Sequence, residues 1–309
     1  MNILVTGAGG QLGLCLRDVV ELTGNGKPDH FVGEPNYYIF KNHDELDITD
    51  ELAVANFVRE NHICVIVNCA AYTNVNKAQE DRDNAYNVNA LGALNLALAA
   101  KENGAVLIHI STDYVHNHMH VTPIKAGSLF DFDIVDREQC FYGFSKAMGE
   151  DLIENSFCKA IIIRTSWLCS EYGKNFVKTM FERARKGEPS QVVIDQTGCI
   201  TDARDLAQFI HRIIENNAST SPYLSRCGVY NFASDGVCTW YDVAREVYRQ
   251  SCGENEAMLV TKRLTEPDEP VKRPPYSVLD LSETERTFDY KPTYWADAIT
   301  HILDRIEEK

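Results

Sequence analysis

Residues 1–22 read MNILVTGAGGQLGLCLRDVVEL and join an apolar strand pattern to a helical pattern through a glycine-rich turn. Met1–Thr6 is predicted to be a strand and Gln11–Leu22 a helix. Between them the glycines have a GxxGxxG spacing, at Gly7, Gly10 and Gly13. Such a turn needs one glycine for the tight bend, one for the approach of a pyrophosphate and one for packing the helix on the strand. The stretch therefore predicts a dinucleotide site, against the alternative of a glycine-rich turn that binds nothing.

Short apolar runs keep alternating with amphipathic stretches up to about residue 170. Further strands are expected at 37–40, 63–68, 106–111 and 160–164, and helices at 50–61 and 85–103. This order predicts an α/β fold, a Rossmann-type doubly wound parallel sheet, with a smaller mixed α/β substrate lobe. We expect an NAD(P)-binding domain over residues 1–170 and a mainly substrate-binding lobe over residues 171–309, from which some segments return to the first domain.

The composition narrows the function classes. The chain has 309 residues and a formal net charge of −15, which argues against binding to a nucleic-acid backbone. No apolar run approaches the length of a membrane helix, and a strand pattern that begins at Asn2 leaves no room for a signal peptide. The ten cysteines form no close CxxC pair, so we expect reduced thiols in a cytoplasmic protein.

Tyr142 and Lys146 form a YxxxK motif at the start of a predicted helix, where positions i and i+4 share one face. An ammonium held near the phenol would favour its deprotonation by up to about 4 kcal/mol at an intermediate dielectric constant. The pair therefore predicts a tyrosine that exchanges a proton with a substrate, against the alternative of two side chains on a solvated face. The same spacing at Tyr37 and Lys41 falls in a predicted strand and is interpreted as chance.

Thr112 directly follows the fourth predicted strand, in the stretch Ser-Thr-Asp-Tyr-Val at 111–115. A hydroxyl there would face the cleft at the carboxyl end of the sheet and could bind a substrate carbonyl. The alternative interpretation is a hydroxyl that only caps the next turn.

These motifs stand in a fixed order with others further along the chain: NCAAYT at 68–73, RTSW at 164–167, DQTG at 195–198 and RPPYSVLD at 273–280. In this order the chain resembles the extended short-chain dehydrogenase/reductases and, more narrowly, the dTDP-4-dehydrorhamnose reductases. The resemblance implies NADPH-dependent reduction of the C4 keto group of dTDP-4-dehydro-L-rhamnose to dTDP-L-rhamnose, in nucleotide-sugar and cell-surface polysaccharide biosynthesis.

The resemblance also implies site residues. Tyr142, Lys146 and Thr112 would be catalytic: Tyr142 would protonate the C4 oxygen, Lys146 would bind the nicotinamide ribose and lower the pKa of the phenol, and Thr112 would orient the carbonyl. Other cofactor contacts would come from Gly7, Gly10, Gln11, Leu12, Gly13, Asp47, Ile48, Ala70, Ala71 and Tyr72. Further substrate contacts would come from Trp167, Asn175 and Arg273, the last two at the nucleotide diphosphate.

The chain departs from the pattern of similar proteins at four places. His116-Asn117-His118 replaces an aromatic and a glycine, residues 137–141 lack a proline, and Ile200 replaces a proline, all in segments expected to cover the substrate. Cys15 stands where some similar proteins have a metal-ligating glutamate at a dimer contact, so we expect either a monomer or a homodimer without a bridging metal. His116, His118 and His120 alternate and would share one side of an extended segment, but we expect no metal ion there.

Two questions stay open at this point. Lys41 favours NADPH, whereas Asp44 or Asp47 favours NADH, because a cation at the end of the second strand suits a 2′-phosphate and an acid suits a ribose hydroxyl. We expect NADPH, with NADH as the alternative. The function alternatives are a reductase or epimerase of another nucleotide-sugar and a non-catalytic NADP-binding regulatory subunit, similar to the methionine adenosyltransferase β subunit.

Overall fold

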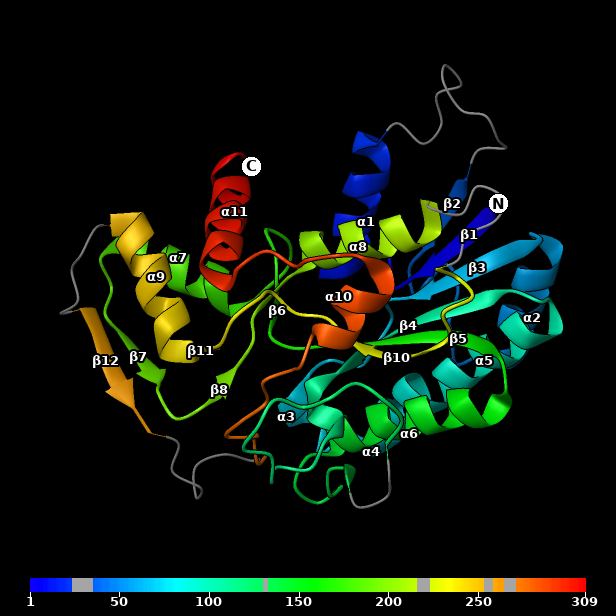
Figure 1. Ribbon diagram of the computed structural model, residues 1–309, viewed down its shortest axis with the longest axis horizontal. Coiled ribbons are helices and arrows are strands. Elements are labelled where there is room, and N and C mark those ends of the chain that lie inside the picture. Colours follow the sequence, from blue (N-terminus) through cyan, green and yellow to red (C-terminus); the bar gives the residue numbers. More distant parts are fainter. Residues whose placement is uncertain (24–35, 130–132, 216–222, 253–257, 264–270) are drawn as a thin grey trace.

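A six-stranded parallel sheet forms the centre of the computed structural model, which describes residues 1–23, 36–129, 133–215, 223–252, 258–263 and 271–309. The strand order is β10-β5-β4-β3-β1-β2, and every neighbouring pair is parallel (Figure 1). The bounds are β1 Asn2–Thr6, β2 Tyr37–Lys41, β3 Ile63–Asn68, β4 Val106–Thr112, β5 Lys159–Thr165 and β10 Gly228–Asn231. This arrangement confirms the predicted α/β fold.

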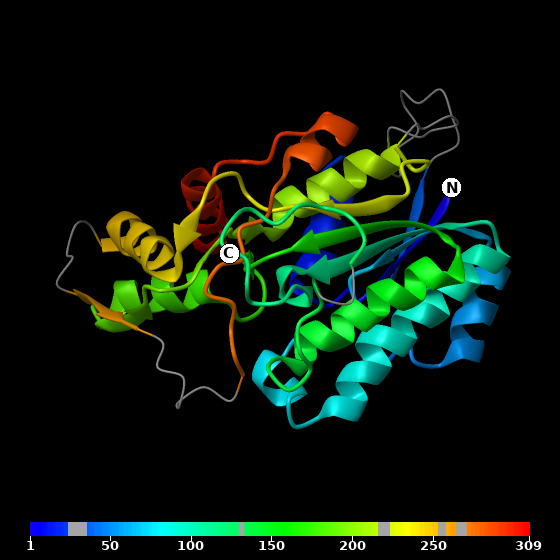
Figure 2. The ribbon, with the colours of Figure 1, turned by 60° about the horizontal axis from the view of Figure 1, so that its bottom comes forward.

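The two faces of the sheet are covered by different helices because successive strand residues point to opposite sides. In β1, Ile3 and Val5 pack into one core with α1 (Gln11–Leu22) and α8 (Ala203–Glu215), whereas Leu4 packs into a second core on the other face. That second face carries α2 (Glu51–Glu60), α5 (Gly92–Glu102) and α6 (Phe141–Ser156). Figure 2 shows the two helical layers on either side of the strands.

The helix expected at 85–103 is present as one helical run over 82–102, with a π-helical turn within it. The chain forms α3 (Val75–Ala78), α4 (Arg82–Tyr86), a π-helical turn at Asn87–Leu91 and then α5. Gly149 of α6 lies against this turn, because a Cβ on that glycine would come within 2.2 Å of the Asn89 carbonyl oxygen. The irregular turn therefore lies where α6 approaches most closely, a tertiary contact that the periodicity of the segment does not reveal.

The second lobe has its own apolar core and several short strand pairs. Helices α7 (Phe176–Lys186), α9 (Trp240–Cys252) and α11 (Trp295–Glu307) pack together there. Strand β7 (Ser190–Val193) pairs with β12 (Leu259–Lys262), β8 (Thr197–Gly198) with β11 (Cys238–Thr239), and β6 (Leu168–Cys169) with β9 (Thr201–Asp202). In contrast, α8, β10 and α10 (Ser282–Phe288) return to the large sheet (Figure 1).

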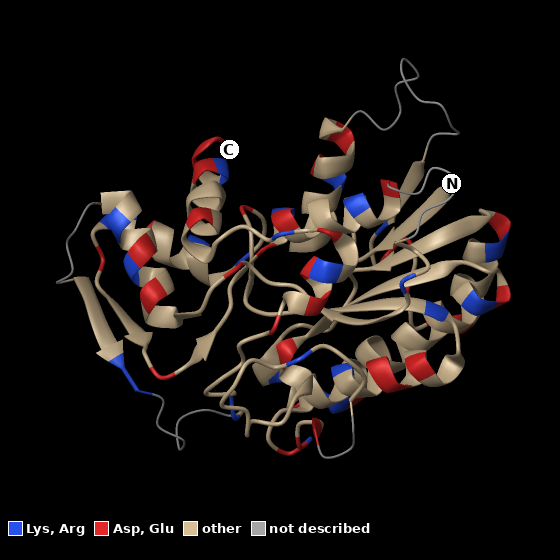
Figure 3. Ribbon diagram, in the orientation of Figure 1, with Lys and Arg blue, Asp and Glu red and all other residues tan. Residues whose placement is uncertain are grey.

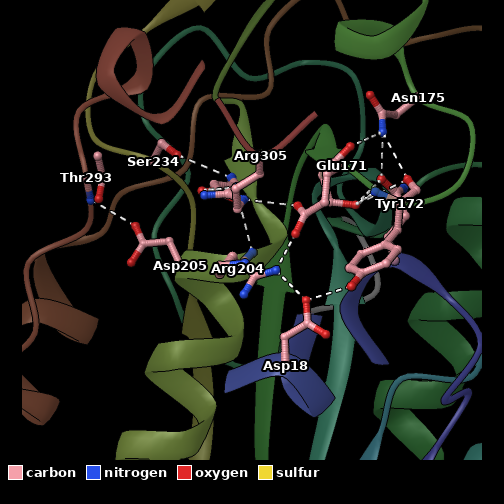
Figure 4. Close-up of polar contacts among 12 residues, drawn as sticks. Asp18, Glu171, Tyr172, Asn175, Arg204, Asp205, Ser234, Thr293 and Arg305 are labelled. Atoms are coloured by element: carbon pink, nitrogen blue, oxygen red, sulfur yellow. Dashed lines mark hydrogen bonds and ion pairs between the residues drawn. The ribbon is translucent and has the colours of Figure 1, made fainter. Parts of the chain in front are cut away.

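A network of charged side chains joins the second lobe to the sheet. Arg204 of α8 donates to both Asp18 of α1 and Glu171, which follows β6, and Figure 4 shows the guanidinium between the two carboxylates. Arg305 of α11 donates to Glu171 Oε2 at 3.1 Å and to both oxygens of Asp202 at 2.7 and 2.8 Å. The Glu171 side chain is fully buried, so the two arginines compensate its charge where water cannot.

Charged residues otherwise lie mainly on helices and loops, and the strands of the large sheet are almost free of them (Figure 3). Within the described parts of the chain, no helix is both long enough and apolar enough to cross a membrane.

One buried ion pair fixes α6 to the sheet. Arg164 of β5 donates from Nε to Glu150 Oε1 at 3.0 Å and from Nη2 to Glu150 Oε2 at 2.6 Å. The two side chains are 0% and 2% exposed, so neither charge has water as a substitute partner. Ser111 at the end of β4 also donates to Glu150, which brings β4, β5 and α6 together at one carboxylate.

Replacing Arg164 by methionine should therefore destabilise the fold strongly. The substitution leaves the Glu150 carboxylate buried without its partner, and we expect a loss of about 3–5 kcal/mol in the free energy of unfolding, measured by urea denaturation. The double variant Arg164→Met, Glu150→Met removes both charges and should recover a large part of that loss. A double variant as unstable as Arg164→Met would contradict the interpretation that the unpaired charge is the cause.

Candidate active site

A cleft of about 840 Å³ opens at the carboxyl ends of the parallel strands. Most of the residues predicted for the site line it. They are Gly7, Gly10, Gln11, Leu12, Asp47, Ile48, Ala70, Ala71, Tyr72, Thr112, Tyr142, Lys146 and Trp167. The topology explains this convergence, because parallel strands of one sheet present all their following loops at the same edge.

The glycine-rich turn has the shape that a bound pyrophosphate requires. Gly7 has a φ of +65°, and a Cβ there would lie 2.5 Å from the Ala70 nitrogen. Gly10 immediately precedes α1, so the N-terminus of this helix faces the cleft with backbone N–H groups that can bind an anion. Gly13 does not line the cleft; a Cβ on it would lie 2.6 Å from the Gly7 carbonyl oxygen, so this glycine serves the packing of helix on strand.

The end of β2 differs from the sequence-based expectation. The Lys41 ammonium lies 3.5 Å from Glu45 and over the Phe57 ring, and Lys41 is not among the residues that line the cleft. His43 and Asp47 do line it, with His43 Nδ1 3.7 Å from Asp47 Oδ1. Partial burial would raise the pKa of Asp47, but hydrogen bonds from the Thr49 amide and hydroxyl lower it below its ordinary value.

Tyr142 reaches the cleft because its neighbour is a glycine. A Cβ on Gly143 would lie 2.1 Å from the Tyr114 carbonyl oxygen, so only glycine lets the first turn of α6 approach the segment after β4 this closely. The Tyr114 and Tyr142 rings then meet edge to face at 5.8 Å. The YxxxK pattern allows any residue at position 143, and only the packing shows that a glycine is required there.

The phenol of Tyr142 is held in its protonated form. Burial raises its pKa above the ordinary value, and a hydrogen bond with Thr112 only partly opposes this. Lys146 was expected to lower this pKa, but in the structure burial is the largest effect and raises it, so the Tyr142 phenol keeps its proton. Thr112 lines the cleft and also caps the short 3-10 helix at Asp113–Val115, since the Tyr114 amide donates to its hydroxyl at 3.3 Å. The capping interpretation of this threonine is confirmed, and its position in the cleft leaves the substrate contact as a prediction.

Lys146 is buried beneath the cleft. Its Nζ donates to the Ile110 carbonyl oxygen at 2.6 Å and lies 3.2 Å from His109 Nε2. Burial lowers the pKa of Lys146 to about 8, against the opposing effects of Glu150 and Cys69. The sequence analysis did not single out His109, although a histidine within the apolar run of β4 was a signal that could have identified it.

Trp167 and Asn175 lie on either side of the chain segment that enters the second lobe. Trp167 has a φ of +44°, lines the cleft and stacks on Trp240 with ring centroids 3.9 Å apart. Asn175 does not line the cleft, because its amide is used within the protein. Its Oδ1 caps α7 by accepting from the Lys178 amide at 3.0 Å, and its Nδ2 donates to Gln11 Oε1 at 2.9 Å and to the Ser170 carbonyl at 2.7 Å.

Arg273 also lies outside the residues that line the cleft. Its Nη1 donates to the Tyr114 hydroxyl at 3.2 Å and its Nη2 to Asn76 Oδ1 at 3.0 Å. Tyr114, to which Arg273 donates, packs its ring against that of Tyr142, so the guanidinium lies beside the cleft and not within it.

The three alternating histidines do not share one set of partners. His116 Nε2 lies 3.2 Å from Arg164 Nη1, and the rings of His116 and His120 meet edge to face at 5.4 Å. Burial lowers the pKa of His116 to about 3 and that of His118 to about 4, so both are neutral. Among the described residues, no three histidine, cysteine or acidic side chains gather as metal ligands.

Several residues of the cleft were not predicted. They are Gly9, His43, Leu46, Cys69, Thr73, Val88, Ile110, Ser111, Thr165, Ser166, Leu168, Gly173 and Lys174. Most follow a strand whose end was already predicted to face the cleft, so strand position alone could have identified them. Gly173 and Lys174 come from the second lobe, and only the tertiary fold brings them opposite Gln11.

Comparisons with known proteins agree with this geometry. A family model described as RmlD substrate binding domain matches residues 1–308. The chain is 35% identical over 307 residues to a dTDP-4-dehydrorhamnose reductase of Aggregatibacter actinomycetemcomitans, which covers 97% of this chain and 98% of that protein. A crystal structure of a dTDP-4-dehydrorhamnose reductase from Clostridium acetobutylicum has a TM-score of 0.85 at 34% identity and covers 99% of this chain and 100% of that one.

A second solved structure, a dTDP-4-dehydrorhamnose reductase from Bacillus anthracis in complex with NADP, has a TM-score of 0.83 at 29% identity, with 98% and 99% of the two chains covered. The likeness thus extends over the sheet, the cleft and the second lobe alike. Because the family model and these alignments span nearly every residue, the chain belongs to the RmlD substrate binding domain family.

Proposed function

We propose that this chain is an NADPH-dependent oxidoreductase that reduces the C4 keto group of dTDP-4-dehydro-L-rhamnose to dTDP-L-rhamnose. The observation that carries the proposal is the convergence of Tyr142, Thr112 and Lys146 in one cleft with the glycine-rich turn. The relatives that match along the whole chain are named for this activity, and one of them was solved with NADP.

The roles of the side chains follow from their protonation and position. The bound nicotinamide supplies a hydride to the carbonyl carbon. The Tyr142 phenol, which burial keeps protonated, gives its proton to the carbonyl oxygen as negative charge develops there. Thr112 is placed beside the phenol to orient that oxygen, and the N-terminus of α1 holds the pyrophosphate. Trp167, stacked on Trp240, offers an apolar wall to the sugar.

The two lobes divide the ligands between them in this proposal. Residues 1–170 bind the cofactor, and residues 171–309 mainly cover the nucleotide-sugar. Arg273 is kept as the candidate for the nucleotide diphosphate, since a guanidinium fork suits that anion. Asn175 acts indirectly, by holding Gln11 of the cofactor turn against the start of α7.

The alternatives make different demands on the site. A regulatory NADP-binding subunit would have no need of a buried lysine and a protonated tyrosine in the same cleft. A reductase or epimerase of another nucleotide-sugar would use the same three side chains, and the choice of sugar falls to the second lobe. Steady-state assays with dTDP-4-dehydrorhamnose and with other 4-keto nucleotide-sugars separate these functions.

Tyr142→Phe should abolish turnover while leaving cofactor binding nearly unchanged, because it removes the proton donor and almost no contact area. We expect a loss of about 10²–10⁴-fold in kcat, followed through NADPH absorbance with dTDP-4-dehydrorhamnose as substrate. Tyr37→Phe is the matched control, since Tyr37 has the same YxxxK spacing but lies exposed in β2. Turnover of Tyr142→Phe close to that of the unaltered protein would remove the phenol from the mechanism.

Cofactor preference should depend on His43 and not on Lys41. His43 lines the cleft and can offer a ring N–H to a 2′-phosphate, whereas Lys41 is paired with Glu45 away from it. We expect His43→Ala to lower the ratio of kcat/KM for NADPH over NADH by roughly twofold to fivefold, the factor that an exposed contact worth up to about 1 kcal/mol provides. Lys41→Ala should leave this ratio within error. A larger change in Lys41→Ala than in His43→Ala would show that the lysine moves to the phosphate when the cofactor binds.

A further inference from the structure

His109 is a buried histidine that has no role in the reaction proposed above. It lies in β4, is 1% exposed, and both of its ring nitrogens have a partner. Nε2 is 3.2 Å from Lys146 Nζ, and Nδ1 is 3.0 Å from Asn68 Nδ2. Burial, reinforced by the charge of Lys146, lowers the pKa of His109 far below its ordinary value, so the ring is neutral and carries a single proton.

The neighbours of Asn68 decide which ring nitrogen carries that proton. The backbone N–H of Ala70 lies 3.1 Å from Asn68 Oδ1, and an amide N–H can only donate. The oxygen of the Asn68 side chain must therefore face Ala70, and Thr6 donates to the same oxygen at 2.8 Å. The Asn68 NH₂ group is then directed at His109, so Nδ1 accepts and the proton of the ring is on Nε2.

This tautomer points an N–H at Lys146. An ammonium has three donors and no acceptor, so it cannot bond to Nε2–H, whereas a neutral amine can accept from it and still donate to the Ile110 carbonyl. We propose that His109 is a positioning residue for Lys146. Asn68 holds the His109 ring in the Nε2–H tautomer, so that only the amine form of Lys146 can accept a hydrogen bond from His109. This inference rests on the proposed function for its consequence in catalysis, though not for its geometry.

The consequence concerns the return of the proton that Tyr142 loses. When the O–H bond of Tyr142 breaks and the new O–H bond forms on the substrate, a phenolate remains. An ammonium at Lys146, on the same face of α6, gives one proton to that phenolate; one N–H bond breaks, the phenol is restored, and the amine left behind accepts from His109. Water then returns one proton to the amine, so one solvent proton is consumed in each turnover.

Other groups also act on Lys146 and set the direction of the expected pH effect. Glu150, one turn along α6, and Cys69, which follows β3, favour the ammonium, while burial opposes it more strongly. With a pKa of about 8, Lys146 loses its proton as the pH rises through that value, so kcat should fall on the alkaline side. The Nε2–H group of His109 adds to the effect of burial.

The direct test is the tautomer of His109 in the full chain labelled with a nitrogen isotope. Nitrogen–proton correlation spectra of the imidazole rings, with His109→Gln used for assignment, should show the Nε2–H tautomer from pH 6 to pH 9. A proton on Nδ1, or an imidazolium in this range, would overturn the proposal. This measurement needs no substrate, so its failure is distinct from failure of the proposed reductase activity.

Asn68→Asp supplies the functional test. One carboxylate oxygen can still accept from Ala70 and Thr6, but the other now faces His109 and requires a proton on Nδ1. We expect the tautomer to switch and the alkaline limb of the kcat profile to move up by about one pH unit or more, because Nε2 then accepts from the ammonium. Thr6→Val is the matched control; Ala70 still orients Asn68, so neither tautomer nor limb should change. If the alkaline limb of the kcat profile moves in Asn68→Asp while the His109 tautomer stays the same, the added charge alone is the cause. That result would refute the proposed role of His109.

Discussion

The ion pair between Glu150 and Arg164 is the contact on which the geometry of the site depends. It lies between α6 and β5 with both side chains almost fully buried, and Ser111 of β4 donates to the same carboxylate. Glu150 is one helical turn beyond Lys146 and two beyond Tyr142, so fixing its carboxylate fixes the rotation of α6 about its own axis. The glycines at 143 and 149 then allow this helix to approach the strands closely enough for the phenol to enter the cleft.

Burial, more than charge pairing, sets the protonation of the site. It raises the pKa of the Tyr142 phenol and lowers that of the Lys146 ammonium to about 8, so both groups are held nearer to their neutral forms than in water. Tyr142 therefore keeps its proton, and Lys146 loses its proton as the pH rises through about 8. The buried hydrogen-bond chain from Asn68 through His109 reaches Lys146, and its first two groups are neutral, which suits a region from which water is excluded.

Hydrogen bonds and ion pairs join α1, which follows the glycine-rich turn, to the second lobe. Gln11, at the start of α1, accepts from Asn175 and from the Ser170 hydroxyl. About two helical turns further along, α1 contributes Asp18 to the network of Arg204 and Glu171 (Figure 4). Gln11 therefore contacts both the N-cap residue of α7 and the segment that carries Gly173 and Lys174 into the cleft. Asn175, for which a substrate contact was predicted, uses its amide here to join the two lobes.

The local patterns in the chain were sufficient for five of the six strands of the sheet, for the glycine-rich turn and for half of the residues that line the cleft. In a parallel sheet the carboxyl ends of all strands lie at the same edge, so each residue that follows a strand could be placed at that edge from sequence alone. What the sequence left undecided depends on contacts between distant segments: the hydrogen bonds of Asn175 and Arg273 within the protein, the pairing of Lys41 away from the cleft, and the π-helical turn within the helix expected at 85–103. The rise in the pKa of Tyr142 could not be predicted either. The sequence shows which charged residue lies near the phenol along the helix, whereas only the packing shows how much water has been removed from around it.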